Sequence, residues 1–585
     1  IKGERKMPNL SLFNSETVEG VSPGHSFQDL SHNVDMDMTF GKLYNTLVLE
    51  CIPGDIIELG NQTEIKFQPL HTPAFARIYV DNHYFFSPLR HLDENWEDFY
   101  TYAIDRTTQL PTFQGHLETY DLSPTSKQLT NRPDLREESS PLTTAERFNL
   151  HSMWDYFGLP VFSGTGTTLD GAKQDASDRM NAYFRELVNE DLAPLIYPLK
   201  AYMHIWDEYY RDEDLYDPVW DYRRCQPKAG FAYPAQPLTR AWMKDYFTSA
   251  RPWRQKGKAP HVPVSTVSAR LSVIVMEGNR VGELFYNGSA GLPGQVSATN
   301  GSFNNQPVLA YMPSHTVTSG FDISDLRMAV QLQKYFELNA RAGNRYTEYL
   351  RAQFASFPSD SRLNRPELIG SCRQEVTISE VLQTSATEAD SPQANRAATA
   401  NTFNRSFIDR YHVEEPGYIM CITSVMIEPA YQYKIDRMWT RRSNFDFYVP
   451  LFANLSEQAV LNHELACYSN PAGVFGYQGR WNEYRTVDNR IAGALRSYQV
   501  LNNSNGPVSA FVGADQQSLD FWHCARNFGS QPVLNSDFIE CKPRTDMFAV
   551  NPEVEYPMIC HLHHHIGAVR PMPRFNNPGR LDHMS

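Results

Sequence analysis

Two apolar patterns limit most strongly what this chain can fold into. In Val34–Phe40, which reads VDMDMTF, apolar and polar residues alternate with a period of two, and this predicts a strand with one buried face. In Gly417–Ile427, which reads GYIMCITSVMI, nearly every residue is apolar and several are β-branched. Such a run predicts a strand that is buried on both faces. Together the two patterns favour a fold built mainly from strands.

The other periodic segments add strands, a few helices and long loops. Further strands are predicted at residues 64–69 and 75–86, and helices at residues 92–103, 176–212 and 322–352. Pro194 and Pro198 must break or kink the second of these helices. Residues 383–404 are small and polar, which predicts a long loop. This balance indicates a β-sandwich with elaborate insertions, not an α/β fold.

Residues 258–320 differ in character from the rest of the chain. The stretch ARLSVIVMEGNRVGELFYNG predicts a hairpin that turns at Gly278-Asn279, and a loop rich in Gly, Ser and Asn follows it. We interpret residues 258–320 as a variable surface insertion. It would separate an N-terminal part of the sandwich, residues 1–257, from a C-terminal part, residues 321–585.

The charge balance and the cysteines exclude several classes of protein. The chain has 53 Lys and Arg against 67 Asp and Glu, a net charge of −14, so tight binding of nucleic acid would need a basic partner. Its eight cysteines are scattered without a C-x-x-C pair, which indicates reduced thiols in a cytosolic product. No run approaches 18 apolar residues and the first residues lack an apolar signal region, so neither a membrane span nor a signal peptide is predicted.

Two polar clusters are candidates for a catalytic or metal-binding site. Asp207 and Glu208 begin an acidic stretch that we interpret as a solvated helix end, although two carboxylates are also what a glycosidase needs. On a strand, His561, His563 and His565 would share one face at a spacing of about 7 Å, which makes them weak candidates for a metal site. A subunit contact or a solvated, pH-sensitive face is the favoured interpretation of the histidines. No catalytic residue, metal or cofactor is predicted.

The segment from Met438 to Val460 has two interpretations. Trp439, Arg441 and Arg442 could stack on single-stranded nucleic acid and neutralise it, with Phe445 and its aromatic neighbours as further platforms. Against this, Pro450 and the apolar residues after it indicate a packed segment or a subunit interface. Packing or an interface is favoured, and contact with nucleic acid is the alternative.

The same segment also resembles a known family. Arg437–Val460, RMWTRRSNFDFYVPLFANLSEQAV, is similar to a stretch typical of the major capsid proteins of the Microviridae, small tailless phages with single-stranded DNA, and of their gokushovirus-type members in particular. Other blocks resemble the same family in the same order, and they lie at residues 7–14, 205–215, 245–257, 323–354, 361–370, 474–485 and 570–583. Residues 258–320, residues 383–404 and the histidine cluster depart from the pattern.

The resemblance implies both a fold and a role. It implies an eight-stranded antiparallel jelly roll with long loop and helical insertions, and a structural protein, not an enzyme. Sixty copies would assemble into a T=1 icosahedral shell around a circular single-stranded DNA genome, with residues 258–320 as the candidate for protrusions at the threefold axes.

A small basic DNA-packaging protein would accompany the genome, and a host surface receptor would be unknown. The protein would belong to the virion and assemble in the bacterial host cytoplasm. A carbohydrate-binding or carbohydrate-active β-sandwich protein is the alternative.

Overall fold

The computed structural model divides the chain into two compact units. The first unit comprises Ile1–Arg254 and Ala342–Ser585, and the second comprises Gln255–Arg341. The structure describes residues 24–70, 75–101, 150–161, 194–257 (without 230 and 232), 272–277, 280–287, 295–298, 323–355 (without 343–344), 359–382 (without 361–362), 396–453, 457–496, 500–508 (without 503–505), 523–548 (without 529–530 and 545–546) and 556–574.

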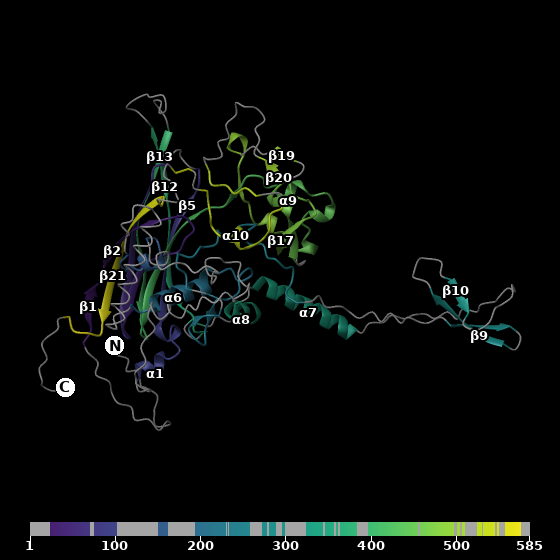
Figure 1. Cartoon of the computed structure of the whole chain (residues 1–585), viewed down its shortest axis with the longest axis horizontal. Coiled ribbons are helices and arrows are strands. Elements are labelled where there is room, and N and C mark those ends of the chain that lie inside the picture. Colours follow the sequence, from purple (N-terminus) through teal and green to yellow (C-terminus); the bar gives the residue numbers. More distant parts are fainter. Residues whose placement is uncertain are drawn as a thin grey trace, which may run out of the picture. The chain divides into compact units, whose positions relative to one another are not determined.

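A six-stranded antiparallel sheet forms one layer of the first unit (Figure 1). Its strands are β1 (Ser26–Asp29), β2 (His32–Met38), β4 (Ile56–Phe67), β12 (Thr377–Leu382), β13 (Arg396–His412) and β21 (Met558–Arg570). Their order is β1-β21-β4-β13-β12, and β2 also pairs with β21. The sheet therefore joins strands from the two ends of the chain, because β21 lies between β4 and the first two strands.

This sheet alternates between a buried and an open face. In β2, Met36 and Met38 turn inward while Asp35 turns outward, so the predicted half-buried strand is confirmed, although it ends at Met38. In β4, Ile57, Leu59, Ile65 and Phe67 are buried, and Glu58 and Lys66 are exposed. The alternation of apolar and polar residues thus shows which face of the sheet packs against the core.

A four-stranded antiparallel sheet forms the second layer. Its strands are β3 (Tyr44–Cys51), β5 (Ile78–Pro88), β11 (Glu367–Glu375) and β14 (Gly417–Ile427), in the order β11-β5-β14-β3. Ile419 and Cys421 of β14 pack against the six-stranded sheet, in a core that includes Leu59 and Ile566. Met420 points to the opposite side, into a core built with helix α6. The predicted strand with two buried faces is confirmed.

A buried polar link crosses the core between the two sheets. The imidazole of His564 in β21 donates from Nε2 to the carbonyl oxygen of Thr46 in β3 at 3.0 Å. Its Nδ1 therefore accepts from the hydroxyl of Tyr84 in β5, also at 3.0 Å. Asn82 of β5 donates to the Thr63 hydroxyl of β4 at 3.2 Å. These directional contacts align both sheets, because a slip by one residue would leave buried groups without partners.

The helices of the first unit are short. They are α1 (Trp96–Tyr100), α4 (Met153–Tyr156), α6 (Tyr197–Ile205), α8 (Tyr346–Phe354), α9 (Asn462–Leu465) and α10 (Ser536–Ile539), with a π-helical turn η4 (Trp206–Tyr210) after α6. Pro198 lies in the first turn of α6, where its missing N–H has no cost, so the predicted break falls at the start of this helix. Residues 176–193 of the predicted helix lie outside the described residues. Within the described chain, no helix is long and apolar enough to cross a membrane.

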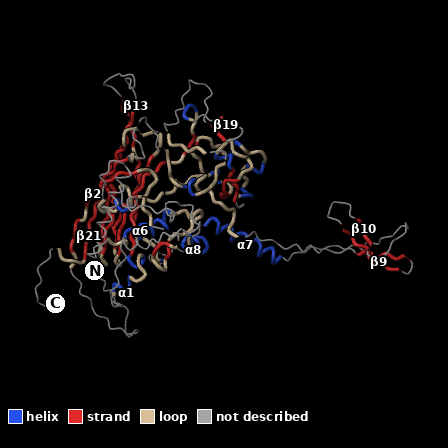
Figure 2. Tube along the Cα trace, in the orientation of Figure 1, coloured by secondary structure: helices blue, strands red, loops and turns tan. Residues whose placement is uncertain are grey.

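Loop-rich segments between residues 428 and 548 form a further part of the first unit (Figure 2). Their strands come in short pairs: β15 (Ala430–Tyr431) with β18 (Asn489–Arg490), β16 (Glu457–Leu461) with β17 (Val474–Gly479), and β19 (Val500–Asn502) with β20 (Gly506–Val508). A core cluster that this part shares with Tyr246 and Phe247 holds it together, and Tyr431, Phe475 and Phe538 are among its members. The guanidinium of Arg526 lies 4.2 Å from the centre of the Phe538 ring and 4.8 Å from that of Phe528.

The second unit contains the predicted insertion 258–320 and a helix after it. Its strands β8 (Ser272–Glu277), β9 (Arg280–Asn287) and β10 (Gln295–Ala298) form one sheet in the order β10-β9-β8. Glu277 pairs with Arg280, which confirms the predicted hairpin, while Gly278-Asn279 lie outside the described residues. Helix α7 spans Ile323–Ala342, so the predicted helix 322–352 is present as two helices, α7 and α8.

The described chain is therefore mainly β, with few helices. Its strand pairs are antiparallel except for the two-residue pair of β15 with β18. The expected fold class is confirmed at this level.

Candidate functional site: an exposed aromatic surface

The segment 437–453 runs as a series of single 3-10 turns. These are η6 (Arg437–Trp439), η7 (Asn444–Asp446) and η8 (Pro450–Phe452). The carboxylate of Asp446 accepts from the backbone N–H groups of Arg442 at 2.9 Å and Ser443 at 2.8 Å. Pro450 opens the third turn, where its fixed φ suits a helical start. Local hydrogen bonds, not pairing in a sheet, thus set the path of this segment.

Large apolar side chains cover the outside of this segment. Within fourteen consecutive residues the exposed ones are Met438, Trp439, Phe445, Phe447, Tyr448, Val449 and Leu451, and we call this set the aromatic surface. Trp439 is 74% exposed and Leu451 is 84% exposed. A monomer rarely leaves apolar side chains of this size in one contiguous stretch in water, so the aromatic surface indicates a contact with a partner.

Arg441 is held inside the segment and stiffens it. Its guanidinium lies 4.4 Å from the centre of the Tyr484 ring and 5.3 Å from that of Phe447. It also forms an ion pair with Glu483 at 3.6 Å, and its side chain is only 10% exposed. Glu483 and Tyr484 belong to the turn η9 (Asn482–Tyr484). One cation therefore joins the aromatic surface to the neighbouring turn.

Hydrogen bonds and an ion pair with residues 459–481 fix the same segment to the rest of the unit. Trp481 donates from its indole N–H to the carbonyl oxygen of Phe452 at 3.0 Å. Arg437 donates to the carbonyl oxygen of Ala459 at 2.8 Å and pairs with the buried Glu464 at 3.3 Å. Burial raises the pKa of Glu464, and the charge of Arg437 opposes that rise. The aromatic surface thus has a rigid support.

The three residues predicted to touch nucleic acid have different surroundings. Trp439 is exposed, and the side chain of Arg442 is exposed as well. Arg441 is bound to Glu483 and to two rings. Sequence reasoning did not find Glu483 and Tyr484 as the supports of the segment. The signal was available in the block 474–485, but nothing in a linear sequence places that block beside residue 441.

The acidic stretch at Asp207 is buried, so its interpretation as a solvated helix end is wrong for its first two members. Asp207 is fully buried in η4 and accepts from Arg211 Nε at 2.7 Å and from the backbone N–H of Val219 at 2.9 Å. Glu208 forms an ion pair with Arg365 Nε at 2.5 Å. Each carboxylate is bound to its own arginine, and this placement gives no support to a glycosidase pair.

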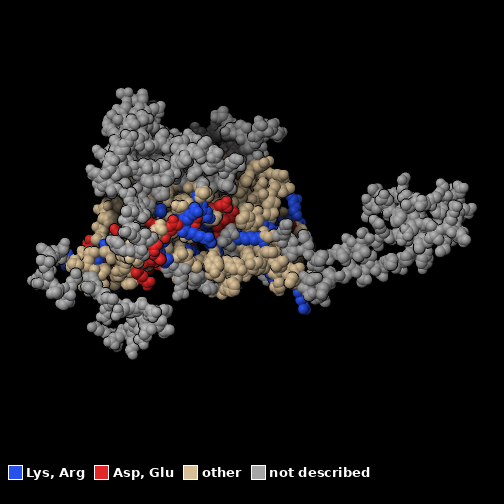
Figure 3. All heavy atoms as spheres, turned by 60° about the horizontal axis from the view of Figure 1, so that its bottom comes forward, with Lys and Arg blue, Asp and Glu red and all other residues tan. Residues whose placement is uncertain are grey.

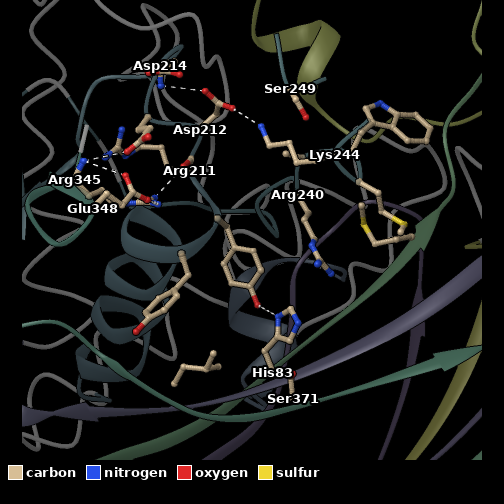
Figure 4. Close-up of a pocket in the computed structure, with 18 of the residues that line it drawn as sticks. His83, Arg211, Asp212, Asp214, Arg240, Lys244, Ser249, Arg345, Glu348 and Ser371 are labelled. Atoms are coloured by element: carbon tan, nitrogen blue, oxygen red, sulfur yellow. Dashed lines mark hydrogen bonds and ion pairs between the residues drawn. The ribbon is translucent and has the colours of Figure 1, made fainter. Parts of the chain in front are cut away.

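A charged pocket of about 860 Å³ lies against β5 and β11 (Figure 4). On its wall, Nδ1 of His83 and the hydroxyl of Tyr210 share a hydrogen bond of 2.6 Å. Arg240, which also lines the pocket, donates to the carboxylate of Asp81 at 2.7 Å. Burial lowers the pKa of His83 to about 4, and the charge of Arg240 adds to this effect. Figure 3 shows Lys and Arg side chains gathered beside Asp and Glu side chains on the face turned to the viewer.

Two carboxylates of this pocket compete for one donor. Glu213 and Glu348 each place an oxygen near the backbone N–H of Arg345, at 3.2 Å and 3.3 Å. Glu348 also forms an ion pair with the Arg345 guanidinium at 3.7 Å. Burial, together with the hydrogen bond and the charge of Glu213, raises the pKa of Glu348 to about 7. Glu348 therefore takes up a proton more readily than an exposed glutamate does.

We expect the Glu348→Gln variant to melt at a higher temperature than the unmodified protein at pH 8.5, and at the same temperature at pH 5. A raised pKa means that the contribution of Glu348 is present at low pH and is lost as the pH rises through about 7. Glutamine mimics the protonated side chain at both pH values. Thermal melting at the two pH values measures this, with Glu375→Gln as the control, because the Glu375 side chain lies 55% exposed in a surface ion pair. A lower melting temperature for Glu348→Gln at pH 8.5 would contradict the expectation.

The three histidines of β21 share one face, as the sequence predicts. His561 contacts Asp35 and His563 contacts Asn33, both on β2, and the rings of His563 and His565 lie 4.1 Å apart. Their neighbour His564 points the other way, into the core. Among the described residues no three His, Cys, Asp or Glu side chains are placed to hold one metal ion. The structure thus adds no support for a metal at His561, His563 and His565.

Comparison with known proteins decides the family. A family profile described as "Capsid protein (F protein)" matches residues 17–161 and 187–580. The chain belongs to this phage capsid protein family. It is 27% identical to Capsid protein VP1 of Chlamydia phage 1, over 98% of this chain and 99% of that protein. It is 29% identical to Capsid protein VP1 of Bdellovibrio phage phiMH2K, over 92% of each chain, and 29% identical to that of Spiroplasma virus 4, over 65% of this chain and 72% of the relative.

The family assignment confirms the resemblance to capsid proteins of the Microviridae and makes this chain a phage capsid protein, from a structural family and not an enzyme family. It also gives the aromatic surface a context, because a capsid protein must bind its neighbours through surfaces that a single chain leaves open. The two carboxylates of the carbohydrate alternative, Asp207 and Glu208, are structural groups within this capsid protein.

The thiols of the capsid protein give a simple check of its packing. All eight cysteines are thiols, not disulfides, and Cys467 alone is exposed, with Cys372 half-buried and the other six buried. We expect one thiol per folded subunit to react with a maleimide before the others, and mass spectrometry of the peptides to place the label on Cys467, although partial burial raises the pKa of this thiol and slows its reaction. Denaturation should release the other thiols for labelling. Fast labelling of Cys421 or Cys560 in the folded subunit would contradict the described core.

Proposed function

We propose that this capsid protein is the major subunit of a T=1 icosahedral shell, in which sixty copies enclose a circular single-stranded DNA genome. The observation that carries the proposal is the family match over nearly the whole chain, together with relatives of almost the same extent. In this proposal the protein resides in the virion and assembles in the cytoplasm of a bacterial host. Function then means mutual fit between copies, not turnover of a substrate.

We further propose that the sandwich is an eight-stranded jelly roll. The eight long strands in chain order are β2, β3, β4, β5, β11, β13, β14 and β21. Numbered 1 to 8, they follow the order 1-8-3-6 in one sheet and 2-7-4-5 in the other. This alternation between sheets is what two nested Greek keys produce, which supports a jelly roll. The short strands β1 and β12 are additions at the two edges of the larger sheet.

The remaining partners follow from charge and from the insertion. A chain with a net charge of −14 does not neutralise a genome by itself, so we propose a small basic protein that accompanies the DNA. Residues 258–320 form part of a separate compact unit, which suits a protrusion, and we propose the threefold axes as its place. A host receptor would bind an outer loop.

The mass of the native assembly tests the proposal. Sixty copies of a 67.0 kDa chain have a mass of about 4 MDa. Sedimentation velocity and mass photometry of the purified protein should find this species, and electron micrographs should show round shells of one size. A protein that stays folded but monomeric at all concentrations would refute the proposed shell.

A further inference from the structure

We propose that the aromatic surface is a contact between two copies of this chain, in which Trp439 and Leu451 are the side chains that the neighbour buries. The proposal rests on the proposed self-assembly and adds to it the place of one interface. The occupant is a second copy, because this chain belongs to a capsid family whose members associate with themselves.

The size of the aromatic surface suits a subunit interface. Its seven exposed side chains include four aromatic ones, and side chains of this kind bury about 150–250 Å² each when fully covered. At roughly half exposure the four aromatic side chains offer on the order of 400 Å², and the three aliphatic ones add to this, so the set is a large part of the roughly 800 Å² that each partner contributes to a standard interface. The largest patch of an ordinary monomer covers about 300–600 Å². The aromatic surface is therefore comparable to the largest apolar patch of an ordinary monomer, and a patch of that size often has a binding function.

The charges of the segment favour a protein partner over nucleic acid. Arg441 pairs with Glu483, and Arg437 pairs with Glu464. Arg480 lies 4.7 Å from the Trp481 ring and donates to the carbonyl oxygen of Phe445 at 3.4 Å. These three cations serve the fold, whereas binding to single-stranded DNA needs cations that face the phosphates. Arg442 is the one exposed cation of the segment, and most of what faces outward beside it is apolar and aromatic, which is the composition of an interface core.

The support beneath the aromatic surface prepares it for binding. The Tyr448 ring meets the Trp481 ring edge-on at 5.6 Å, and its backbone N–H donates to the Tyr484 hydroxyl at 3.3 Å. The Phe445 ring meets that of Phe452 at 6.0 Å. Rings that are already fixed lose little conformational entropy when a neighbour covers them, so more of the buried area becomes affinity. Trp439 and Leu451 are the most exposed members and are therefore the natural anchors.

Two substitutions on the full chain test this contact. The Trp439→Ser and Leu451→Ser variants remove exposed apolar groups without opening the core, so both should fold with the far-ultraviolet circular dichroism and melting temperature of the unmodified subunit. The concentration at which half of the protein is assembled should rise at least about 10-fold for each variant. Sedimentation velocity over a dilution series measures that concentration.

The control is Phe407→Ser, because Phe407 is 70% exposed on the open face of the six-stranded sheet, in strand β13 and not in the aromatic surface. It should assemble as the unmodified protein does. The proposal is overturned if Trp439→Ser and Leu451→Ser assemble normally, if Phe407→Ser impairs assembly as strongly, or if the two variants form normal shells that have lost DNA, because that result assigns the surface to the genome. If the unmodified chain forms no shell, the proposed function itself fails.

Discussion

The Asp81→Asn variant is expected to lose about 3 kcal/mol of unfolding free energy, because it removes the buried carboxylate that pairs with the largely buried Arg240 and the half-exposed Arg373. Asp81 on β5 has a side chain that is 1% exposed, and it accepts from Arg373 at 2.6 Å and 2.8 Å and from Arg240 at 2.7 Å. Burial acts to raise the pKa of Asp81, but the two arginines outweigh it and the pKa is lowered. Asparagine would leave both guanidinium groups facing each other without a counter-charge.

Urea unfolding of the isolated subunit measures this loss, and Glu58→Gln is the matched control. Glu58 also pairs with an arginine, Arg410, at 3.6 Å, but both side chains are more than half exposed. Such a surface pair contributes about 0–1 kcal/mol, so the control should unfold almost as the unmodified subunit does. Equal effects of Asp81→Asn and Glu58→Gln would show that the Asp81 carboxylate is solvated, which contradicts its described burial.

The second large effect is a change in acid sensitivity in the His564→Gln variant. Burial lowers the pKa of His564 to about 3, and the hydrogen bond to Thr46 only partly opposes this. The ordinary pKa of histidine is about 6.5. Below that pH, His564 is protonated in the unfolded chain but stays neutral in the folded chain. The neutral side chain thus supports the fold fully above pH 6.5, and this support is lost as the pH falls toward 3. Between pH 7 and pH 5 the loss is on the order of 2 kcal/mol.

We therefore expect the His564→Gln variant to lose about 2 kcal/mol less unfolding free energy than the unmodified subunit when the pH is lowered from 7 to 5. The comparison is between slopes, so a constant cost of the substitution at both pH values does not affect it. His412→Gln is the control, because His412 is exposed at the end of β13. If His564→Gln and His412→Gln have the same pH dependence as the unmodified subunit, His564 is accessible to water and the buried link between the sheets is wrong.

The parts of the fold that the sequence predicts are those with a local periodic signal. The alternation around Met36 and the apolar run of β14 both reflect which faces are covered, and the structure confirms both. The hairpin of β8 and β9 is likewise local, because Gly278-Asn279 suits its turn. The pairing of β21 with β2 and β4 could not be predicted, because it joins residues separated by hundreds of positions. The hydrophobic pattern of a strand shows which face is buried, but not which strand lies beside it.

The site was harder to predict than the fold, for a physical reason. Trp439, Arg441 and Arg442 are adjacent in sequence, yet the structure binds Arg441 to Glu483 and leaves Trp439 exposed. The sequence around Asp207 and Glu208 is typical of a solvated helix end, yet both side chains are buried and form ion pairs with Arg211 and Arg365. Arg211 is only four residues from Asp207, but Arg365 comes from a distant part of the chain, and no local pattern shows that either carboxylate is buried. Composition alone therefore cannot separate a charge that serves the fold from one that faces a partner.

The most direct measurement for the central claim, that this chain acts by binding copies of itself in a closed shell, is a cryo-electron microscopy reconstruction of the native assembly. We predict a T=1 particle of sixty subunits in which Trp439 and Leu451 lie buried against a neighbouring copy. A particle whose subunits meet elsewhere, with these two side chains in solvent or against nucleic acid, would contradict the account.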